Sequence, residues 1–312
     1  MTEVPLKVYP SGRNCRQQVF FPPRARHARQ CRRRLTGLAG AREGAMKHAS
    51  SGGRERFLVE KFLRRGLQVL GVNPDRGLLL PPARDEESLR GYYEYLKKYS
   101  FRLFIRDVIR CRDCMSIGDL QKYCSEKAAR NYLDLLLEWG MLIALPGDRY
   151  RLLPGGIHSF GDTFEWFVAQ VFIREFFCPA VWNVRFGDMA AGGDYDVIAS
   201  VEEKLLYVEA KSSPPKHVDS SEVAAFLARV ESLRPHCCIF LEDTHLRMQD
   251  KIAVLFEQEL AERLPRSRVV RLEREIFSIG TSVFIVNSRP DLVSNLRTCI
   301  ACFLRSSGLR LS

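Results

Sequence analysis

The sequence from residue 192 to residue 213 contains two apolar runs separated by charged residues, a pattern typical of a β-hairpin. The first run covers residues 195–201, and the second follows a charged turn at 202–204. Side chains alternate between the two faces of a strand. One face of the second run is therefore predicted to carry Leu205, Tyr207, Glu209 and Lys211, and the other Leu206, Val208 and Ala210. A hairpin of this kind brings Asp196 beside Glu209.

Asp196, Glu209 and Lys211 would place two carboxylates and an ammonium group on one patch of this hairpin. Glu209 and Lys211 belong to an apolar run, where burial of a charge costs several kcal/mol unless a partner or a metal ion compensates it. Mg²⁺ prefers oxygen ligands, and proteins bind it through one or two carboxylates together with phosphate and water. The patch therefore predicts a cation site. The alternative is a structural ion pair between Asp196 and Lys211.

A third carboxylate comes from residues 161–177, whose apolar spacing predicts a helix. Glu165 lies at the edge of the apolar stripe and leans towards its packed side, because the residues three, four and seven positions later are all apolar. One explanation is that Glu165 stabilises the positive end of the helix dipole, which is worth about 0.3 to 1 kcal/mol. The other explanation is that Glu165 is a ligand of the site.

A helix glutamate, a strand with Asp-Val-Ile-Ala and a strand with Glu-Ala-Lys-Ser together resemble the PD-(D/E)XK, or restriction endonuclease-like, superfamily. The resemblance covers residues 160 to about 245 and assigns the motif aspartate to Asp196. It assigns the (D/E)XK pair to Glu209 and Lys211, and the helix glutamate to Glu165. Tyr195 stands where the motif has proline, and Asp194 is a neighbouring candidate for the aspartate.

The resemblance implies a metal-dependent nuclease that hydrolyses phosphodiester bonds, and DNA is the expected substrate. Mg²⁺, which Mn²⁺ can replace, would be held by Asp196, Glu209 and the Ala210 carbonyl, with assistance from Glu165. Lys211 would orient and activate the attacking water. The alternative from another class is a non-catalytic DNA-binding protein that uses the nuclease-like fold as a scaffold.

The rest of the C-terminal half also follows the pattern of this superfamily. A helix at 220–233 and a strand at 236–241 complete the order helix, three strands, helix, strand, which predicts an α/β restriction endonuclease-like core with a mixed central sheet (αβββαβ). Further elements are predicted as a helix at 248–264, a strand at 282–286 and a helix at 290–304.

Upstream, residues 99–155 resemble a winged helix. Helices are predicted at 101–111, 117–124 and from Ser125 to Gly140, followed by a hairpin with strands 141–145 and 149–153. Such modules place their third helix in the DNA major groove. Lys127, Arg130 and Asn131 lie on its predicted outward side. Asp134 and Glu138 lie there too, which also fits a plain solvated helix or a protein contact.

Net charge does not identify the partner of the predicted folded part. The formal charge of the chain is +11, but residues 1–50 alone carry nine Arg and two Lys against two Glu. The predicted organisation is an Arg-rich, disordered leader at 1–53, a helical connecting segment at 54–98, the winged-helix-like domain at 99–155 and the nuclease-like domain at 156–312. The leader could be a nucleic-acid-binding tail or an organelle transit peptide, and Met46 could be the true start.

The expected location is the cytoplasm, or more generally the cell interior. No apolar run reaches the length of about 20 residues that a membrane helix needs, and no secretory signal is visible. The ten cysteines are then expected to be reduced thiols. DNA is the expected partner, and a homodimer would allow both strands of a duplex to be cut.

Overall fold

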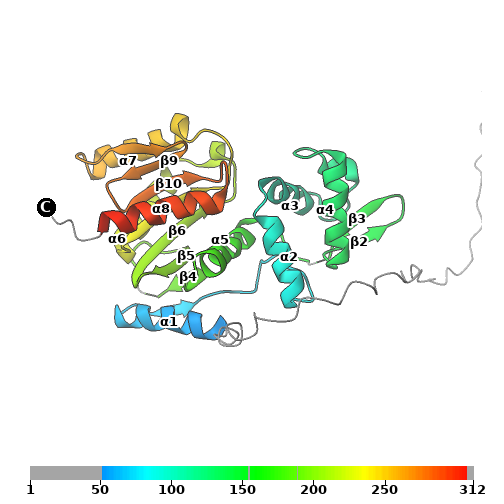
Figure 1. The fold of residues 1–312 in the computed structure, drawn as a ribbon, viewed down its shortest axis with the longest axis horizontal. Helices are drawn as coiled ribbons and strands as arrows, with labels where there is room; N and C mark the ends of the chain where they lie inside the picture. The colour runs from blue at the N-terminus through cyan, green and yellow to red at the C-terminus, as the bar shows by residue number, and fades with distance from the viewer. Residues whose placement is uncertain (1–50, 154, 188, 308–312) are drawn as a thin grey trace, which may run out of the picture. The chain divides into compact units, whose positions relative to one another are not determined.

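An eight-stranded mixed sheet organises the C-terminal part of the chain in the computed structural model, which describes residues 51–153, 155–187 and 189–307 (Figure 1). Its strand order is β1-β4-β5-β6-β7-β10-β9-β8. β6 runs parallel to β7 and β7 parallel to β10, whereas the other neighbours are antiparallel. The strands are β1 Val69–Gly71, β4 Ala180–Phe186, β5 Asp194–Val201, β6 Lys204–Lys211, β7 Cys237–Glu242, β8 Val269–Glu273, β9 Ile276–Ile279 and β10 Val283–Asn287.

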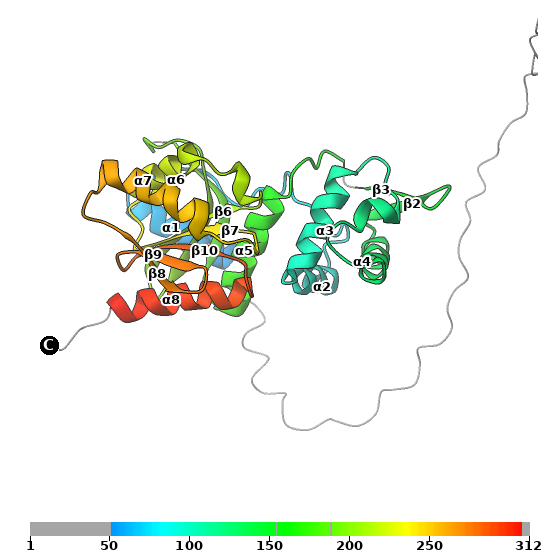
Figure 2. The same ribbon diagram turned by 90° about the horizontal axis from the view of Figure 1, so that it is seen from above.

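Helices cover both faces of this sheet (Figure 2). One hydrophobic cluster joins the sheet to α1, α6 and α7, and a second cluster joins the opposite face to α5 and α8. A π-helical turn, η3, leads into α7, and a 3-10 turn, η2, precedes α6. The bounds are α1 Ser51–Arg64, α5 Gly161–Glu175, η2 Pro215–His217, α6 Ser220–Leu233, η3 Gln249–Ala253, α7 Val254–Arg263 and α8 Leu292–Ser307. The predicted α/β class with a mixed sheet is therefore confirmed.

The region between β1 and α5 contains helices and one hairpin. Its elements are α2 Glu86–Leu96, α3 Tyr99–Arg110, η1 Ile117–Leu120, α4 Glu126–Glu138, β2 Leu142–Leu145 and β3 Arg149–Leu152. Of the helix predicted at 117–124, only the 3-10 turn η1 is present, and it ends at Leu120. The next helix, α4, is capped by Ser125, which accepts a hydrogen bond from the Ala128 N–H. Buried residues of α2, α3 and α4 share one hydrophobic cluster with α5 and the sheet, so the apolar core continues across residue 155.

Two parts of the sheet were absent from the sequence prediction. Residues 54–98 were predicted as a helical connecting segment, but they contain β1, which pairs with β4, as well as most of α1 and the whole of α2. β1 has only three residues, too few to show a period of two. The strands β8 and β9 form a hairpin that was also missed. The predictions for residues 1–50, including Met46 and the Arg-rich leader, lie outside the described residues.

A buried ion pair fastens α3 to the end of β7. Arg102 is 1% exposed, and Asp243, directly after β7, is 0% exposed. Arg102 Nε lies 3.0 Å from both Asp243 carboxylate oxygens, and Arg102 Nη2 lies 2.7 Å from Oδ1. Arg106 also pairs with Asp243. Burial alone would raise the pKa of Asp243, but the charges of Arg102 and Arg106 outweigh this effect and hold the pKa below its ordinary value.

Replacing Arg102 by methionine should therefore lower the free energy of unfolding by about 3 kcal/mol, because it leaves a buried carboxylate without its main partner. The change is measured by urea denaturation at neutral pH. Arg130→Met is the control, since Arg130 pairs with Glu126 on the exposed surface of α4 and should change stability little. Equal effects of the two substitutions would contradict the importance given to the buried pair.

Candidate functional site

Strands β4 and β5 share an irregularity at Asn183 and Asp196. Trp182 pairs with Val197 and Val184 pairs with Tyr195, so Asn183 lies opposite Asp196. Asn183 has a φ of 48°, a left-handed conformation that asparagine tolerates better than most residues. In a regular strand, residues two positions apart face the same side. Here Val181 and Val184 are three positions apart, as are Tyr195 and Ile198, yet all four belong to one hydrophobic cluster. The regular alternation of both strands is therefore reset at Asp196.

Asp196 reaches across to β6 where the regular pairing of β5 and β6 ends. The last paired residues are Val197 and Val208. Beyond them, the Ala210 N–H donates a hydrogen bond of 2.7 Å to Asp196 Oδ2. A side-chain carboxylate thus takes the place of the next backbone acceptor, which fixes Asp196 beside the Glu209-Ala210 segment.

Glu209 lies at the centre of a cluster of charges. Its side chain is 1% exposed, and the Tyr207 hydroxyl donates a hydrogen bond to it. Lys211 Nζ lies 3.0 Å from Glu209 Oε1, and Arg229 Nη1, from α6, lies 3.1 and 3.0 Å from its two carboxylate oxygens. Lys211 Nζ also lies 3.3 Å from Glu222 Oε1. Two cations and a hydroxyl therefore compensate the buried charge of Glu209.

Carboxyl groups still outnumber cations at this site. Glu165 Oε2 is buried and has no hydrogen-bond partner. Burial, followed by the charge of Asp196, raises the pKa of Glu165 to about 9. Burial and the charge of Glu209 also raise the pKa of Asp196 well above its ordinary value. The site is therefore short of positive charge, and Glu165 in particular is protonated at neutral pH.

A further buried acid lies next to Lys211 on the neighbouring strand. Glu242 pairs with Lys211 in the parallel β6-β7 register, is 0% exposed, and neither of its carboxyl oxygens has a hydrogen-bond partner. Burial and the charge of Asp243 raise its pKa to about 9. The sequence prediction missed Glu242 because it follows five residues of an apolar strand and belongs to no local motif.

The structure brings the predicted residues Glu165, Asp196, Glu209 and Lys211 into one region, in which Ala210 also lies. Asp194, the competing aspartate, instead forms an exposed ion pair with Arg185. Lys211 pairs with Glu209 and Glu222 in the described part of the chain, rather than with Asp196 as the structural alternative required.

Arg229 and Glu222 were missed by sequence reasoning, although a signal was present. They are seven residues apart on α6, with Phe226 between them, and this spacing places all three on one face of a helix. Phe226 is buried against Tyr207. A cation and an acid that flank a buried aromatic residue on the helix after β6 could therefore have been assigned to the site.

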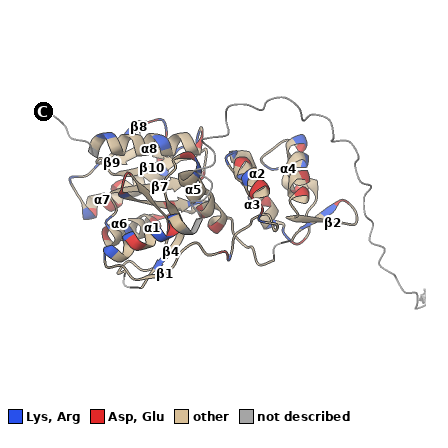
Figure 3. Cartoon of the chain, turned by 60° about the horizontal axis from the view of Figure 1, so that its bottom comes forward, with Lys and Arg blue, Asp and Glu red and all other residues tan. Residues whose placement is uncertain are grey.

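The three residues predicted to contact DNA lie on the surface of α4. Lys127, Arg130 and Asn131 are exposed, and Arg130 pairs with Glu126 at 2.6 Å. Both acidic and basic residues occur along this helix, as the colours of Figure 3 show. The exposed face of α4 is thus of mixed charge.

The side chains of this patch provide only some of the ligands that a magnesium ion needs. Among the described residues, no group of three or more His, Cys, Asp or Glu side chains is arranged to hold a metal ion. Mg²⁺ often takes only one or two protein carboxylates and completes its shell with water and phosphate. The unpartnered oxygen of Glu165 and the excess of carboxyl groups fit such a partial site.

Among the described residues, no helix is long and apolar enough to cross a membrane.

Comparisons with known proteins give a distant structural likeness. No family model matches the sequence, and no curated protein matches it. The chain is similar to the solved structure of protein VC1899 from Vibrio cholerae, with a TM-score of 0.40 and 15% identity over 69% of this chain and 53% of that chain. It is similar to Can2 from Sulfobacillus thermosulfidooxidans in complex with cyclic tetra-adenylate, with a TM-score of 0.40, 12% identity and the same coverages. The chain thus spans about half the length of these two proteins, and the likeness carries no argument about its activity.

The raised pKa of Glu165 predicts how stability depends on pH. Between the ordinary value of 4.5 and the folded value of about 9, the folded protein binds more protons than the unfolded chain, so stability falls as pH rises through this range. Glu165→Gln removes this contribution. Thermal denaturation should show the variant to be more stable than the wild type near the upper end of the range and equal to it near the lower end.

Glu257→Gln on the exposed surface of α7 is the control for this experiment, because it should leave the pH dependence unchanged. Parallel stability curves for the wild type and Glu165→Gln from about pH 4.5 to 9 would show that Glu165 is ionised in the folded protein, contrary to the expected behaviour.

Proposed function

We propose that this chain is a divalent-cation-dependent nuclease of the PD-(D/E)XK type, with a restriction endonuclease-like core, that hydrolyses phosphodiester bonds in DNA. The observation that carries the proposal is the meeting of Glu165, Asp196, Glu209 and Lys211 in one largely buried patch with too little positive charge. Purely structural ion pairs leave no buried carboxyl oxygen without a partner, whereas Glu165 Oε2 is buried and has none. A bound divalent cation would supply that partner once Glu165 has lost its proton.

Each residue has a distinct role in this proposal. Asp196, Glu209, the Ala210 carbonyl and Glu165 would hold Mg²⁺ or Mn²⁺. The ion would offset the charge of the phosphate and make bound water more acidic. Burial would lower the pKa of Lys211, but the charge of Glu209 outweighs it and raises the pKa above the ordinary value. Lys211 therefore acts as a cation, donating hydrogen bonds to the attacking water and stabilising negative charge on the phosphate.

Arg229 and Tyr207 act as positioning residues for Glu209. Arg229 lies on α6 and Tyr207 on β6, and both contact the Glu209 carboxylate. Neither belongs to the (D/E)XK motif. Their contacts hold the carboxylate in one orientation beside Lys211.

In the same proposal, the region from α3 to β3 is a winged-helix-like module, and Lys127, Arg130 and Asn131 on α4 contact DNA. A homodimer would supply the two sites needed to cut both strands.

A second candidate is a DNA-binding protein without hydrolytic activity. It is favoured by one observation, namely that Lys211 and Arg229 already compensate Glu209 without a metal ion. In this case the sheet would serve as a scaffold for the helical region, and the buried acids would have no ligand.

Removing the ammonium group separates the two candidates. Lys211→Ala should lower the rate of Mg²⁺-dependent DNA cleavage by about 100-fold or more, because a preorganised donor to the transition state is lost, while DNA binding is retained. Cleavage is followed on plasmid, linear, single-stranded and branched DNA with Mg²⁺, with Mn²⁺ and with EDTA. Lys216→Ala, an exposed lysine of η2, is the matched control and should cleave like the wild type.

Two outcomes of this experiment would contradict the leading proposal. Undiminished cleavage by Lys211→Ala would remove the lysine from the mechanism. Binding of DNA by the wild type, with no cleavage under any metal condition, would favour the scaffold candidate.

A further inference from the structure

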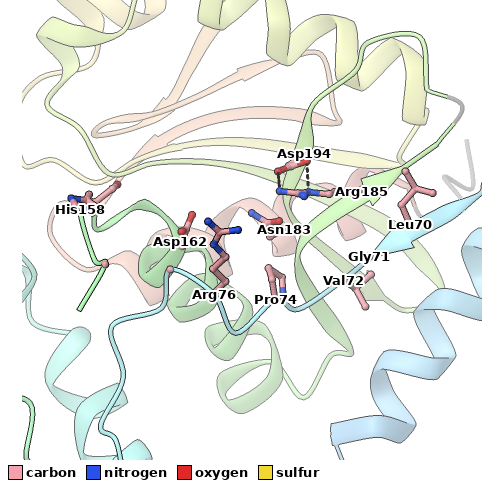
Figure 4. A pocket seen from close by; sticks show the side chains of 13 residues that line it. Leu70, Gly71, Val72, Pro74, Arg76, His158, Asp162, Asn183, Arg185 and Asp194 are labelled. Carbon is pink, nitrogen blue, oxygen red and sulfur yellow. Dashed lines mark hydrogen bonds and ion pairs between the residues drawn. The ribbon is translucent and has the colours of Figure 1, made fainter. Parts of the chain in front are cut away.

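A pocket of about 570 Å³ opens beside the carboxylate patch (Figure 4). Three segments form its walls: β1 with the loop that follows it, the loop before α5 with the first turn of that helix, and the strands β4 and β5. Its lining includes Gly71, Val72, Pro74, Arg76, Asp162 and Asn183. This volume is within the usual range of about 300 to 1,000 Å³ for sites that bind small molecules.

The inner wall of the pocket touches the proposed catalytic patch. Asn183, which lines the pocket, lies opposite Asp196 in the sheet, and its side chain hydrogen-bonds to Glu165. Asp162 lies one turn before Glu165 on α5, and its charge contributes to the raised pKa of Glu165. A ligand in the pocket would therefore lie directly beside a phosphate placed at Asp196 and Glu209.

The charges in the pocket leave one arginine free. Arg185 lines the wall but is held by Asp194, with two contacts of 3.0 Å. Arg76 is exposed and has no ion-pair partner in the described part of the chain, and its side chain extends into the pocket in Figure 4. Val72 and Pro74, from the same segment, add an apolar wall. The pocket thus combines one cation without an ion-pair partner, a small apolar wall and the polar side chains of Asp162 and Asn183.

The shape of the loop holds Arg76 over the pocket. Gly77 has a φ of 87°, and a Cβ added to it would lie 2.0 Å from Asp162 Oδ2. The left-handed backbone and the nearby Asp162 side chain both favour glycine at that position. The segment that carries Arg76 therefore ends in a turn that a larger residue would strain.

We propose that this pocket binds a single unpaired nucleotide next to the phosphate that is cut. Arg76 would pair with the phosphate of that nucleotide, Val72 and Pro74 would pack against its base, and the polar groups of Asp162 and Asn183 would accept or donate hydrogen bonds. A base inside a duplex cannot reach such a pocket without leaving its partner. The substrate class is therefore DNA with single-stranded character, and this inference rests on the proposed function for the position of the phosphate.

Two substitutions test the pocket in different ways. Arg76→Ala removes the free cation. Gly71→Leu fills the space, because a Cβ added at Gly71 meets no atom within 4 Å and its backbone is not left-handed. Arg266→Ala is the matched control, since Arg266 is an exposed arginine in the turn between α7 and β8, has no ion-pair partner among the described residues and does not line the pocket.

The experiment measures binding by the full chain carrying Lys211→Ala, in EDTA, so that cleavage cannot interfere. The probes are a short labelled single strand of DNA and a blunt duplex of the same sequence. Arg76→Ala should weaken binding of the single strand by about tenfold, as expected when one charge-assisted contact is lost. Gly71→Leu should weaken it by about as much, because the leucine side chain takes the space of the nucleotide. Duplex binding and the Arg266→Ala control should change little.

The inference is overturned if both pocket variants bind the single strand as tightly as their parent, or if they lose single strand and duplex equally. Its failure can be told apart from failure of the proposed function. Metal-dependent cleavage by the wild type together with unaffected pocket variants would leave the nuclease proposal intact and remove the pocket. Selective loss of single-strand binding, together with a wild type that cuts nothing, would support the pocket and remove the nuclease.

Discussion

The burial of the Glu209 carboxylate beneath Lys211 and Arg229 is the interaction on which the candidate site depends. Glu209 is only 1% exposed, and burial of a carboxylate is costly unless other groups replace the water it has lost. Lys211 comes from the same strand, Arg229 from α6, and Tyr207 adds a hydroxyl. This arrangement ties α6 to the sheet and sets the direction of Lys211. Because Lys211 and Arg229 already pair with Glu209, neither cation forms an ion pair with Glu165 or Asp196. The pKa of both remaining carboxyl groups is therefore raised by burial and by the neighbouring acids.

The same strand ends connect the site to the helical region. The Asp243 N–H donates a hydrogen bond of 2.8 Å to the Lys211 carbonyl, and the Asp243 side chain is held by Arg102 and Arg106 of α3. Glu242 lies beside Lys211 in the parallel register. The backbone position of Lys211 is therefore fixed by β7, through the parallel register and through the Asp243 N–H. A substitution of Arg102 or Arg106 that displaces Asp243 would therefore also displace the backbone of Lys211, because Asp243 hydrogen-bonds to it.

Local periodicity was enough to predict the hairpin and part of the site. The alternation along β6 placed Glu209 and Lys211 on one face and Ala210 on the other, as the structure has them, and the turn at Glu202 and Glu203 has the left-handed backbone of a tight hairpin. The order of helix, three strands, helix and strand was also predicted correctly. These features depend on neighbours in the sequence, so one chain without relatives contains the information.

The rest of the site depends on contacts between distant residues. Asn183 resets the alternation of β4, and no composition rule for a strand anticipates a left-handed residue there. Arg229 and Glu242 reach Glu209 and Lys211 only after α6 and β7 have packed against β6. The excess of carboxyl groups likewise becomes visible only when burial is known. The sequence therefore indicated the candidate residues that the structure brings together, whereas the structure adds the groups that surround them.

In the proposed nuclease, the protonated carboxyl groups at this patch exchange their protons for a divalent cation. Isothermal titration calorimetry of Mg²⁺ binding near neutral pH, in two buffers with different ionisation enthalpies, tests this exchange directly, because ligands must lose their protons when a metal binds. We expect saturable binding that releases about one proton or more per ion. We also expect Glu165→Gln to reduce this release. Absence of Mg²⁺ binding, or binding without proton release, would contradict this proposal.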